Sequence, residues 1–151
     1  MNMPMQNRIQ AARAAAIARY FESFAPTDIA RLGDFYASDA RFKDPFNEVQ
    51  GIDAIAGVYR HMFAALDAPR FTISNRIVDG TQLFLVWEFS FRFRRFHAGL
   101  EQKVRGGSHL VLDEAGLISL HRDYWDAAEE LYEKLPFLGG LMRWLKKRAS
   151  G

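Results

Sequence analysis

The feature that most constrains the fold is a long run of alternating residues between positions 82 and 94. Every second residue is apolar, and these side chains fall on one face: Leu83, Leu85, Trp87, Phe89, Phe91 and Phe93. A period of two is typical of a half-buried strand, and a strand of this length spans roughly 40 Å at ~3.3 Å per residue. Such a strand must curve to stay inside a chain of 151 residues, so the pattern predicts a strongly bent sheet.

Helical periodicity comes before the strands. Apolar residues at helical spacing predict a first helix over 8–24 that ends at Pro26, and a third helix over 51–66. Between them, Thr27 is a candidate N-cap for a second helix. The side chains expected to face inward from this second helix are Ile29, Leu32, Phe35 and Tyr36.

Three further segments read as extended, besides a short piece at 40–44. Alternation predicts strands over 71–79, 101–112 and 117–125, with turns at Asp79-Gly80 and at 113–116. In the first of these, Phe71, Ile73 and Ile77 alternate with polar residues up to the turn. The Gly106-Gly107 pair is expected to form a bulge that helps the sheet to bend.

Three helices followed by four antiparallel strands indicate an α+β domain with its helices on one face of the sheet. We expect a cone-shaped roll, with the helices packed in the concave side of a strongly curved antiparallel sheet. The chain contains no repeat and no linker, so it is read as one domain, 1–151. The mouth of such a cone is expected to form an apolar pocket for a small hydrophobic molecule.

Charge and composition exclude several classes of function. The net charge is +2, but the segment RWLKKR (143–148) carries four positive charges, which leaves −2 on the rest. A body without a basic face argues against binding to nucleic acid. No apolar run is long enough to span a membrane, and the first twenty residues lack the apolar core of a signal peptide, so we expect a cytoplasmic protein.

Motifs for metals and cofactors are also missing from the sequence. The chain has no cysteine, which excludes disulfides, thiolate zinc sites and cysteine nucleophiles. No two histidines have metal-binding spacing, and neither a Walker loop nor a GxGxxG motif occurs. We therefore expect no metal and no cofactor.

Asp44 is the first candidate catalytic residue. Pro45 favours an extended Asp44 at the end of a strand, and the neighbours Phe42 and Phe46 are apolar. A carboxylate in apolar surroundings becomes a stronger base, which suits the removal of a proton from carbon. The alternative is an ordinary Asp-Pro turn on the surface.

Three tyrosines form the second candidate group. Tyr20, Tyr36 and Tyr59 lie on the apolar faces of three different expected helices. A buried phenol needs a hydrogen-bond partner, so the three can join in one cluster that donates to an oxyanion. The alternative is that each is a core tyrosine bonded to a backbone carbonyl.

The last strand carries the third candidate group. His121 and Asp123 are two residues apart and so point to one face, together with Trp125. An imidazole beside a carboxylate is a candidate acid–base pair. The alternative is a pair on the solvent face of the sheet. His61 is expected at the edge of its helix and His97 at the surface.

The C-terminal segment 127–148 is expected to form a basic amphipathic helix. Leu138, Leu141, Met142 and Leu145 share one face, with the basic residues largely opposite. Such a helix can lie on an anionic membrane surface. Packing over the domain or at a subunit interface is the favoured interpretation.

Five segments taken together resemble the ketosteroid isomerase and SnoaL-like branch of the nuclear transport factor 2-like superfamily. In order along the chain they are ARYFES (18–23), FYASDARFKDPF (35–46), GIDAIAGVYR (51–60), LDEAGLI (112–118) and DYW (123–125). The resemblance covers 13–126. It implies the cone-shaped fold and a homodimer formed through the exposed face of the sheet.

The resemblance to the isomerases also implies roles for particular residues. It places Asp44 at the general base and Tyr20 at the oxyanion donor, with Tyr36 and Tyr59 supporting that donor. Trp125 falls on a pocket wall, and Trp87 of the long strand is expected to line the same pocket. The second oxyanion donor is a protonated aspartate in the isomerases. Its position here is Ser108, a weaker acid.

The segment GLISLHRD (116–123) resembles the SnoaL-like polyketide cyclases instead. In those enzymes the aspartate at the position of Asp123 acts as acid and base, and the histidine at the position of His121 lines the site. Arg122 replaces their tryptophan. The sequence therefore predicts cofactor-free proton transfer on a hydrophobic carbonyl compound by an isomerase, cyclase or lyase. The alternatives are a non-catalytic binding protein for an apolar metabolite or lipid, and a purely structural dimerisation module.

Overall fold

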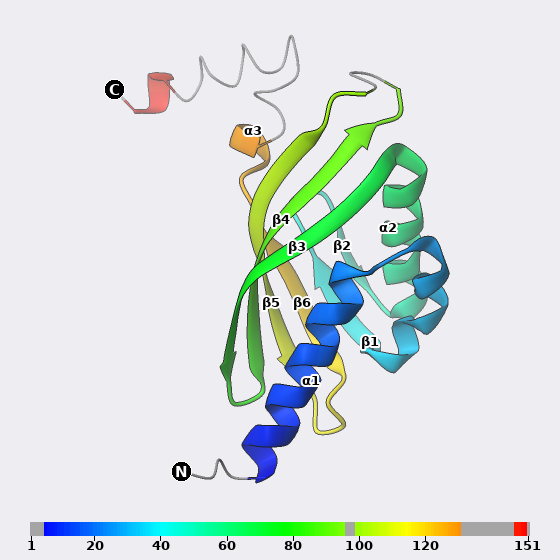
Figure 1. Ribbon diagram of the computed structural model, residues 1–151, viewed down its shortest axis with the longest axis vertical. Helices are drawn as coiled ribbons and strands as arrows, with labels where there is room; N and C mark the ends of the chain where they lie inside the picture. Colours follow the sequence, from blue (N-terminus) through cyan, green and yellow to red (C-terminus); the bar gives the residue numbers. More distant parts are fainter. Residues whose placement is uncertain (1–4, 96–98, 131–146, 151) are drawn as a thin grey trace.

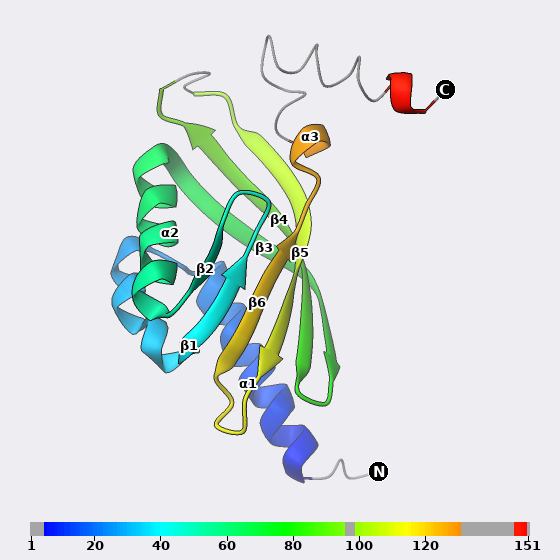
Figure 2. The same cartoon turned by 180° about the vertical axis from the view of Figure 1, so that it is seen from behind.

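The computed structural model describes residues 5–95, 99–130 and 147–150. They form a mixed α+β fold around a curved sheet of six strands that does not close into a barrel (Figure 1). The strand order is β2-β1-β6-β5-β4-β3. The helices lie on the concave side, and Figure 2 shows the opposite face of the sheet from behind.

Three helical elements pack against the concave face. They are α1 (Met5–Glu22), the 3-10 helix η1 (Pro26–Asp34) and α2 (Ile52–Ala65). The first and third expected helices are confirmed. The prediction for the second helix was wrong at both ends: its N-cap is Ala25 and not Thr27, and η1 ends at Asp34, before Tyr36. Proline suits a first helical turn, where its missing N–H would have no intrahelical partner.

The strands are β1 (Tyr36–Lys43), β2 (Glu48–Gln50), β3 (Leu66–Asp79), β4 (Gln82–Phe93), β5 (Gln102–Leu112) and β6 (Ile118–Tyr124). The last four confirm the expected strands, and they pair antiparallel in chain order. The expectation of a wholly antiparallel sheet was wrong, because β1 pairs in parallel with β6. Tyr36 therefore lies on a strand and not on the expected helix.

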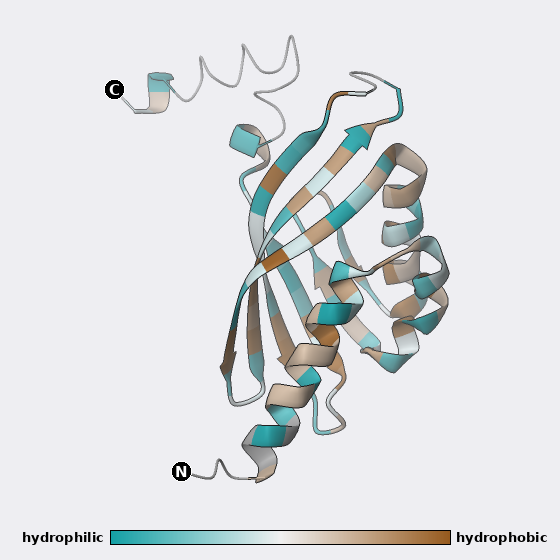
Figure 3. Ribbon diagram, in the orientation of Figure 1, coloured by the Kyte–Doolittle hydropathy of each residue, from teal (hydrophilic) through white to brown (hydrophobic). Residues whose placement is uncertain are grey.

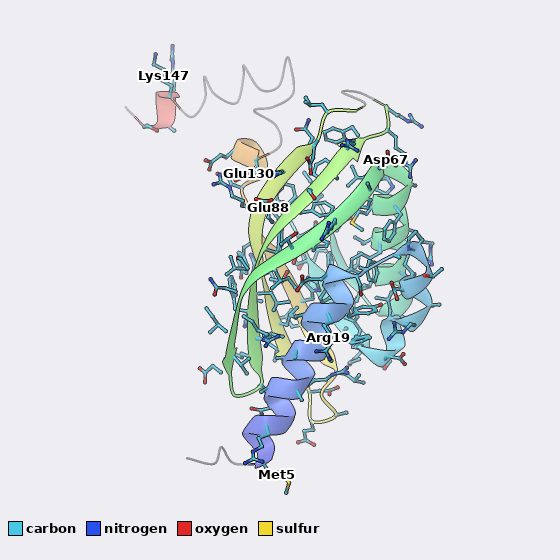
Figure 4. All side chains as sticks on the ribbon, viewed as in Figure 1. Met5, Arg19, Asp67, Glu88, Glu130 and Lys147 are labelled. Atoms are coloured by element: carbon cyan, nitrogen blue, oxygen red, sulfur yellow. The ribbon has the colours of Figure 1, made fainter. Side chains whose placement is uncertain are left out.

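The core lies between the sheet and the helices. Leu83, Leu85, Trp87 and Phe91 of β4 are buried, which confirms the apolar face expected for this strand. Figure 3 shows the alternation of hydrophobic and hydrophilic residues along the central strands. Figure 4 shows side chains filling the space between the sheet and the helices. Ile17 of α1 and Ile55 of α2 are fully buried against this layer.

A bulge in β3 changes which of its residues face inward. Ile73 pairs with Trp87, whereas Asn75 pairs with Val86, so Ser74 is an extra residue on this strand. An extra residue moves every later side chain to the other face. Ile77 is consequently 59% exposed, although in the sequence it continues the alternation of Phe71 and Ile73.

The glycine pair in β5 does not form the expected bulge. The pairing of β4 with β5 continues without a shift from Gln82 to Phe91, and it passes through both glycines. Their role is to leave room for rings. A Cβ on Gly106 would lie 2.6 Å from Cη2 of Trp87, and one on Gly107 would lie 2.6 Å from Cζ of Phe84.

A short helix follows the last strand of the sheet. Helix α3 (Ala127–Glu130) follows β6, and Arg105 of β5 donates two hydrogen bonds to Oε1 of its Glu130, at 3.1 and 3.0 Å. Most of the amphipathic helix expected over 127–148 lies outside the described residues. Within the described residues, no helix is both long and apolar enough to cross a membrane.

Candidate functional site

A cavity of about 230 Å³ lies beside the inner face of the sheet. Its walls come from the end of β1, from α2 and from β3 to β6. Most of the lining side chains are apolar. Much of the lining consists of aromatic rings from β3 and β4: Phe71, Trp87, Phe89, Phe91 and Phe93. Two carboxylates, those of Asp44 and Asp123, also line the cavity.

Asp44 lies in a turn directly after β1. Its Oδ1 accepts hydrogen bonds from the backbone N–H of Phe46 (2.8 Å) and of Asn47 (2.6 Å), and the Asn47 amide donates to both oxygens. Nearby Lys43 pairs with Glu48 at 3.1 Å. Asp44 therefore organises a turn, as the alternative interpretation expected, and it also faces the cavity.

Asp123 belongs to a buried hydrogen-bonded pair with His121. The imidazole Nε2 lies 2.7 Å from Asp123 Oδ1, and the histidine is only 3% exposed. Both residues face inward from β6, so the alternative of a solvent-facing pair is wrong. The carboxylate reaches the cavity, while His121 lies behind it in the core.

A second chain of hydrogen bonds, from residues on β4 and β5, ends on the same carboxylate oxygen. Ser108 of β5 pairs with Asp123 across the sheet, and its hydroxyl donates to Oδ1 at 2.5 Å. The Trp87 indole N–H in turn donates to the Ser108 hydroxyl at 2.8 Å. Both hydrogen bonds to Asp123 thus end on Oδ1, and Oδ2 has no hydrogen-bond partner among the described residues.

Two tyrosines extend the network on the far side of His121. The Tyr36 hydroxyl lies 2.6 Å from Nδ1 of His121 and 2.9 Å from the Tyr59 hydroxyl. Burial, with further contributions from neighbouring groups, raises the pKa of both phenols well above 10.0. They therefore stay neutral near pH 7 and keep their hydroxyl protons.

Tyr20 is separate from this network. Its hydroxyl donates to the backbone carbonyl of Asp28 at 2.6 Å, and its ring stacks on Phe35 with a centroid distance of 3.8 Å. Burial, chiefly, raises its pKa as well. The expectation of one cluster of three tyrosines was wrong, because a main-chain acceptor in η1 lies within reach of Tyr20. Its side chain does not line the cavity.

A second, smaller void of about 30 Å³ adjoins the network. Tyr59, Ser108, His121 and Asp123 line it, together with apolar side chains that include Trp87. This volume accommodates about one water molecule, and the polar groups around it can satisfy the hydrogen bonds of that water.

Three further residues that line the cavity bear on the predictions from the sequence. Trp125, expected on a wall, lines the cavity, and its ring packs edge-on against Phe46 at a centroid distance of 5.4 Å. Asn47 and His61 also line it, although neither was predicted as a site residue from the sequence. His61 is two residues beyond Tyr59 on α2, at the helix edge where it was expected.

Metal-binding side chains do not gather in the described part of the chain. Across residues 5–95, 99–130 and 147–150, no group of three His, Asp or Glu side chains is arranged to bind a metal ion.

Solved structures with the same fold come from several bacteria. A hypothetical protein from Catenulispora acidiphila, with a ketosteroid isomerase-like fold and in complex with trimethylamine, is 18% identical with a TM-score of 0.65, over 86% of this chain and 92% of that one. A putative SnoaL-like polyketide cyclase from Jannaschia is 16% identical with a TM-score of 0.66, over 85% and 92%.

An epoxide hydrolase from M. tuberculosis, described as LEH-like, shares the fold too. It is 18% identical with a TM-score of 0.63, over 81% of this chain and 86% of that one. At these identities the three structures establish the fold alone. No curated protein matches the chain.

A family model confirms the resemblance seen in the sequence. The model for the SnoaL-like domain matches residues 17–121, which is most of the chain. The matched region runs from within α1 to His121 in β6, and it includes β1, α2 and β3 to β5. The chain is therefore a member of the SnoaL-like domain family.

Proposed function

We propose that this chain catalyses cofactor-free proton transfer on a hydrophobic carbonyl compound, as an isomerase, cyclase or lyase. The observation that carries the proposal is the position of Asp123. Its carboxylate lies on the wall of a mostly apolar cavity, and His121 and Ser108 both bind its Oδ1. A carboxylate base oriented in this way presents its other oxygen to a substrate.

In the proposed reaction Asp123 removes a proton from the carbon next to the carbonyl. The C–H bond breaks, an O–H bond forms on Asp123, and the electron pair moves to the carbonyl oxygen as an enolate. Return of the proton to carbon restores the carboxylate. Tyr59 lines the cavity as a neutral phenol, and in the proposed reaction its hydroxyl turns away from Tyr36 to donate to the enolate oxygen.

The assignment of the base changes from the one expected from sequence. Both carboxylate oxygens of Asp44 accept hydrogen bonds inside its turn, from two backbone N–H groups and the Asn47 amide, whereas Oδ2 of Asp123 has no hydrogen-bond partner among the described residues. We therefore assign proton transfer to Asp123. Asp44 holds the turn that forms part of the cavity wall and adds a negative charge to that wall. His121 orients Asp123, and Tyr36 orients His121.

The test measures exchange of α-protons in deuterated buffer, with cyclohex-3-enone as the probe ketone. We expect the protein to accelerate exchange above the buffer rate, and Asp123→Asn to lower that acceleration by about 100-fold or more. Asparagine retains an acceptor for Ser108 and His121, so the fold is expected to persist. NMR spectroscopy of the ketone measures the rates.

Asp44→Asn and Asp39→Asn complete the design. Asp39 is exposed on β1 and outside the cavity lining, so it controls for loss of one charge. We expect Asp39→Asn to leave exchange unchanged and Asp44→Asn to change it by less than about tenfold. Equal exchange in Asp123→Asn and the unmodified protein would refute the role of Asp123. Loss in Asp44→Asn alone would return the base to Asp44.

A further inference from the structure

The cavity is lined by more acidic than basic side chains. Asp44 approaches from the turn after β1, and Asp123 approaches from β6. Among the described residues that line the cavity there is no lysine and no arginine, and His61 is the one side chain that can take up a positive charge. Two carboxylates in apolar surroundings attract a cation and repel an anion.

The aromatic side chains that line the cavity also favour a cation. Nine of the eighteen lining residues are aromatic. Several of these rings are nearly perpendicular to one another: Phe71 and Trp87 cross at 84°, and Phe46 and Trp125 at 74°. Perpendicular rings turn faces in different directions, and an aromatic face carries partial negative charge.

We propose that the cavity selects ligands that carry a positively charged amine with apolar substituents, such as a tertiary or quaternary ammonium group. Rings provide both the apolar contact and the cation–π attraction. The carboxylates of Asp44 and Asp123 provide the countercharge. A carboxylate or phosphate ligand would meet repulsion from both.

The size of the cavity agrees with this class of ligand. A volume of about 230 Å³ accommodates a small ammonium compound and excludes a large lipid. A positive charge beside the carbonyl would also stabilise the enolate of the proposed reaction. The inference rests on the proposed function only because both use the same cavity, and its test measures binding without turnover.

The test compares two probes of the same shape. Choline carries a quaternary nitrogen, and 3,3-dimethylbutan-1-ol carries a neutral carbon in its place. Binding is followed by the indole N–H signals of Trp87 and Trp125 in NMR spectra, which localise the probes to the cavity. The measurements are made at about pH 8, where imidazole side chains are ordinarily neutral.

We expect choline to bind about tenfold more tightly than the neutral alcohol. Asp123→Asn and Asp44→Asn should each weaken choline binding several-fold and leave binding of the alcohol unchanged. Asp39→Asn, which removes a charge outside the cavity, should leave both unchanged. Raising the salt concentration should weaken only choline binding, because it screens charges.

Equal or tighter binding of the neutral alcohol would overturn the inference. Binding of neither probe would overturn it as well, because the cavity would then not recognise small ammonium compounds. A choline preference that persists in both cavity variants would place its cause outside Asp44 and Asp123, and would overturn the assignment. The exchange experiment with the neutral ketone is unaffected by these outcomes, so the two proposals can fail separately.

Discussion

Tyrosine shows most clearly how the surroundings of a single residue decide its role. Tyr20, Tyr36 and Tyr59 are all buried, and each has a raised pKa. Tyr20 nevertheless bonds to a main-chain carbonyl, whereas Tyr36 joins Tyr59 to His121. A phenol takes the acceptor within reach, and burial then makes loss of its proton costly.

We predict that the protein loses stability above about pH 10. The pKa values of the three buried tyrosines are higher in the folded chain than the ordinary value near 10. The unfolded chain therefore releases these protons first as pH rises. Stability is complete below about pH 10 and is lost as pH rises toward the folded pKa values.

Replacement of Tyr36 measures how much this residue contributes to the loss of stability above about pH 10. In Tyr36→Phe, stability should fall less steeply between about pH 10 and 11, because one tyrosine no longer contributes. The free energy of unfolding from urea titrations at several pH values measures the slope. Tyr124→Phe serves as the control, because Tyr124 is 48% exposed. A slope in Tyr36→Phe as steep as in the unmodified protein would contradict the prediction.

Within the strands, single residues set what the sheet presents to the core. The extra residue Ser74 turns Ile77 outward. Gly106 and Gly107 keep a continuous ladder and leave space for Trp87 and Phe84. Gly106 thus allows the Trp87 indole to approach Ser108, to which it donates a hydrogen bond.

We predict that Gly106→Ala destabilises the protein and disturbs the cavity. The added methyl would lie 2.6 Å from Cη2 of Trp87 and 2.8 Å from the Tyr124 carbonyl oxygen, and the latter is backbone that cannot easily move. We expect a loss of about 1–3 kcal/mol in the free energy of unfolding, the usual cost of overpacking. Urea denaturation and the Trp87 indole N–H signal measure the two effects.

Gly57→Ala is the matched control. Gly57 lies inside α2, and a Cβ there meets nothing within 4 Å. Alanine in a helix interior is favoured over glycine by roughly 0.5–1 kcal/mol, so this variant should be slightly more stable. Similar changes in both variants would argue that space around Gly106 is not limiting.

For the whole molecule, the site depends on two strands that are far apart in sequence. The parallel pairing of β1 with β6 places Phe42 beside His121 and Tyr36 beside Ile118. This pairing brings Tyr36 within reach of His121, and it places the turn with Asp44 beside the cavity that Asp123 also lines.

We predict a homodimer formed through the outer face of the sheet, as the family resemblance implies. On that face Ile77 pairs with Phe84 across β3 and β4, and Ile77 is 59% exposed. Burial of such side chains stabilises an interface. Sedimentation equilibrium should give twice the chain mass for the unmodified protein, and Ile77→Asp should weaken the dimer by at least about tenfold.

Leu100→Asp is the control for this experiment. Leu100 is 58% exposed and follows β4, away from the pairing of Ile77 with Phe84. The same charge placed there should leave the dimer intact. A monomeric unmodified protein would refute the prediction, and equal dissociation of both variants would refute the choice of face.

The candidate site was only partly predictable. His121, Asp123, Ser108 and Trp87 come together because neighbouring strands place them on one face, which alternation indicates. Asn47 and His61 had no signal of their own, because facing a cavity depends on what packs opposite. Tyr20 was placed in the site by its position on an apolar helix face and by the resemblance, whereas its contact with Asp28 depends on the path of η1.

The sequence by itself determined the two long helices, the four antiparallel strands and the apolar face of β4. These follow from local periodicity, which depends only on residues that are close together in the sequence. Only the tertiary structure decided the parallel pairing of β1 with β6, the bulge at Ser74 and the network from Tyr59 to Trp87. Each depends on contacts between distant segments, and the packing of the whole chain selects among many locally equivalent arrangements.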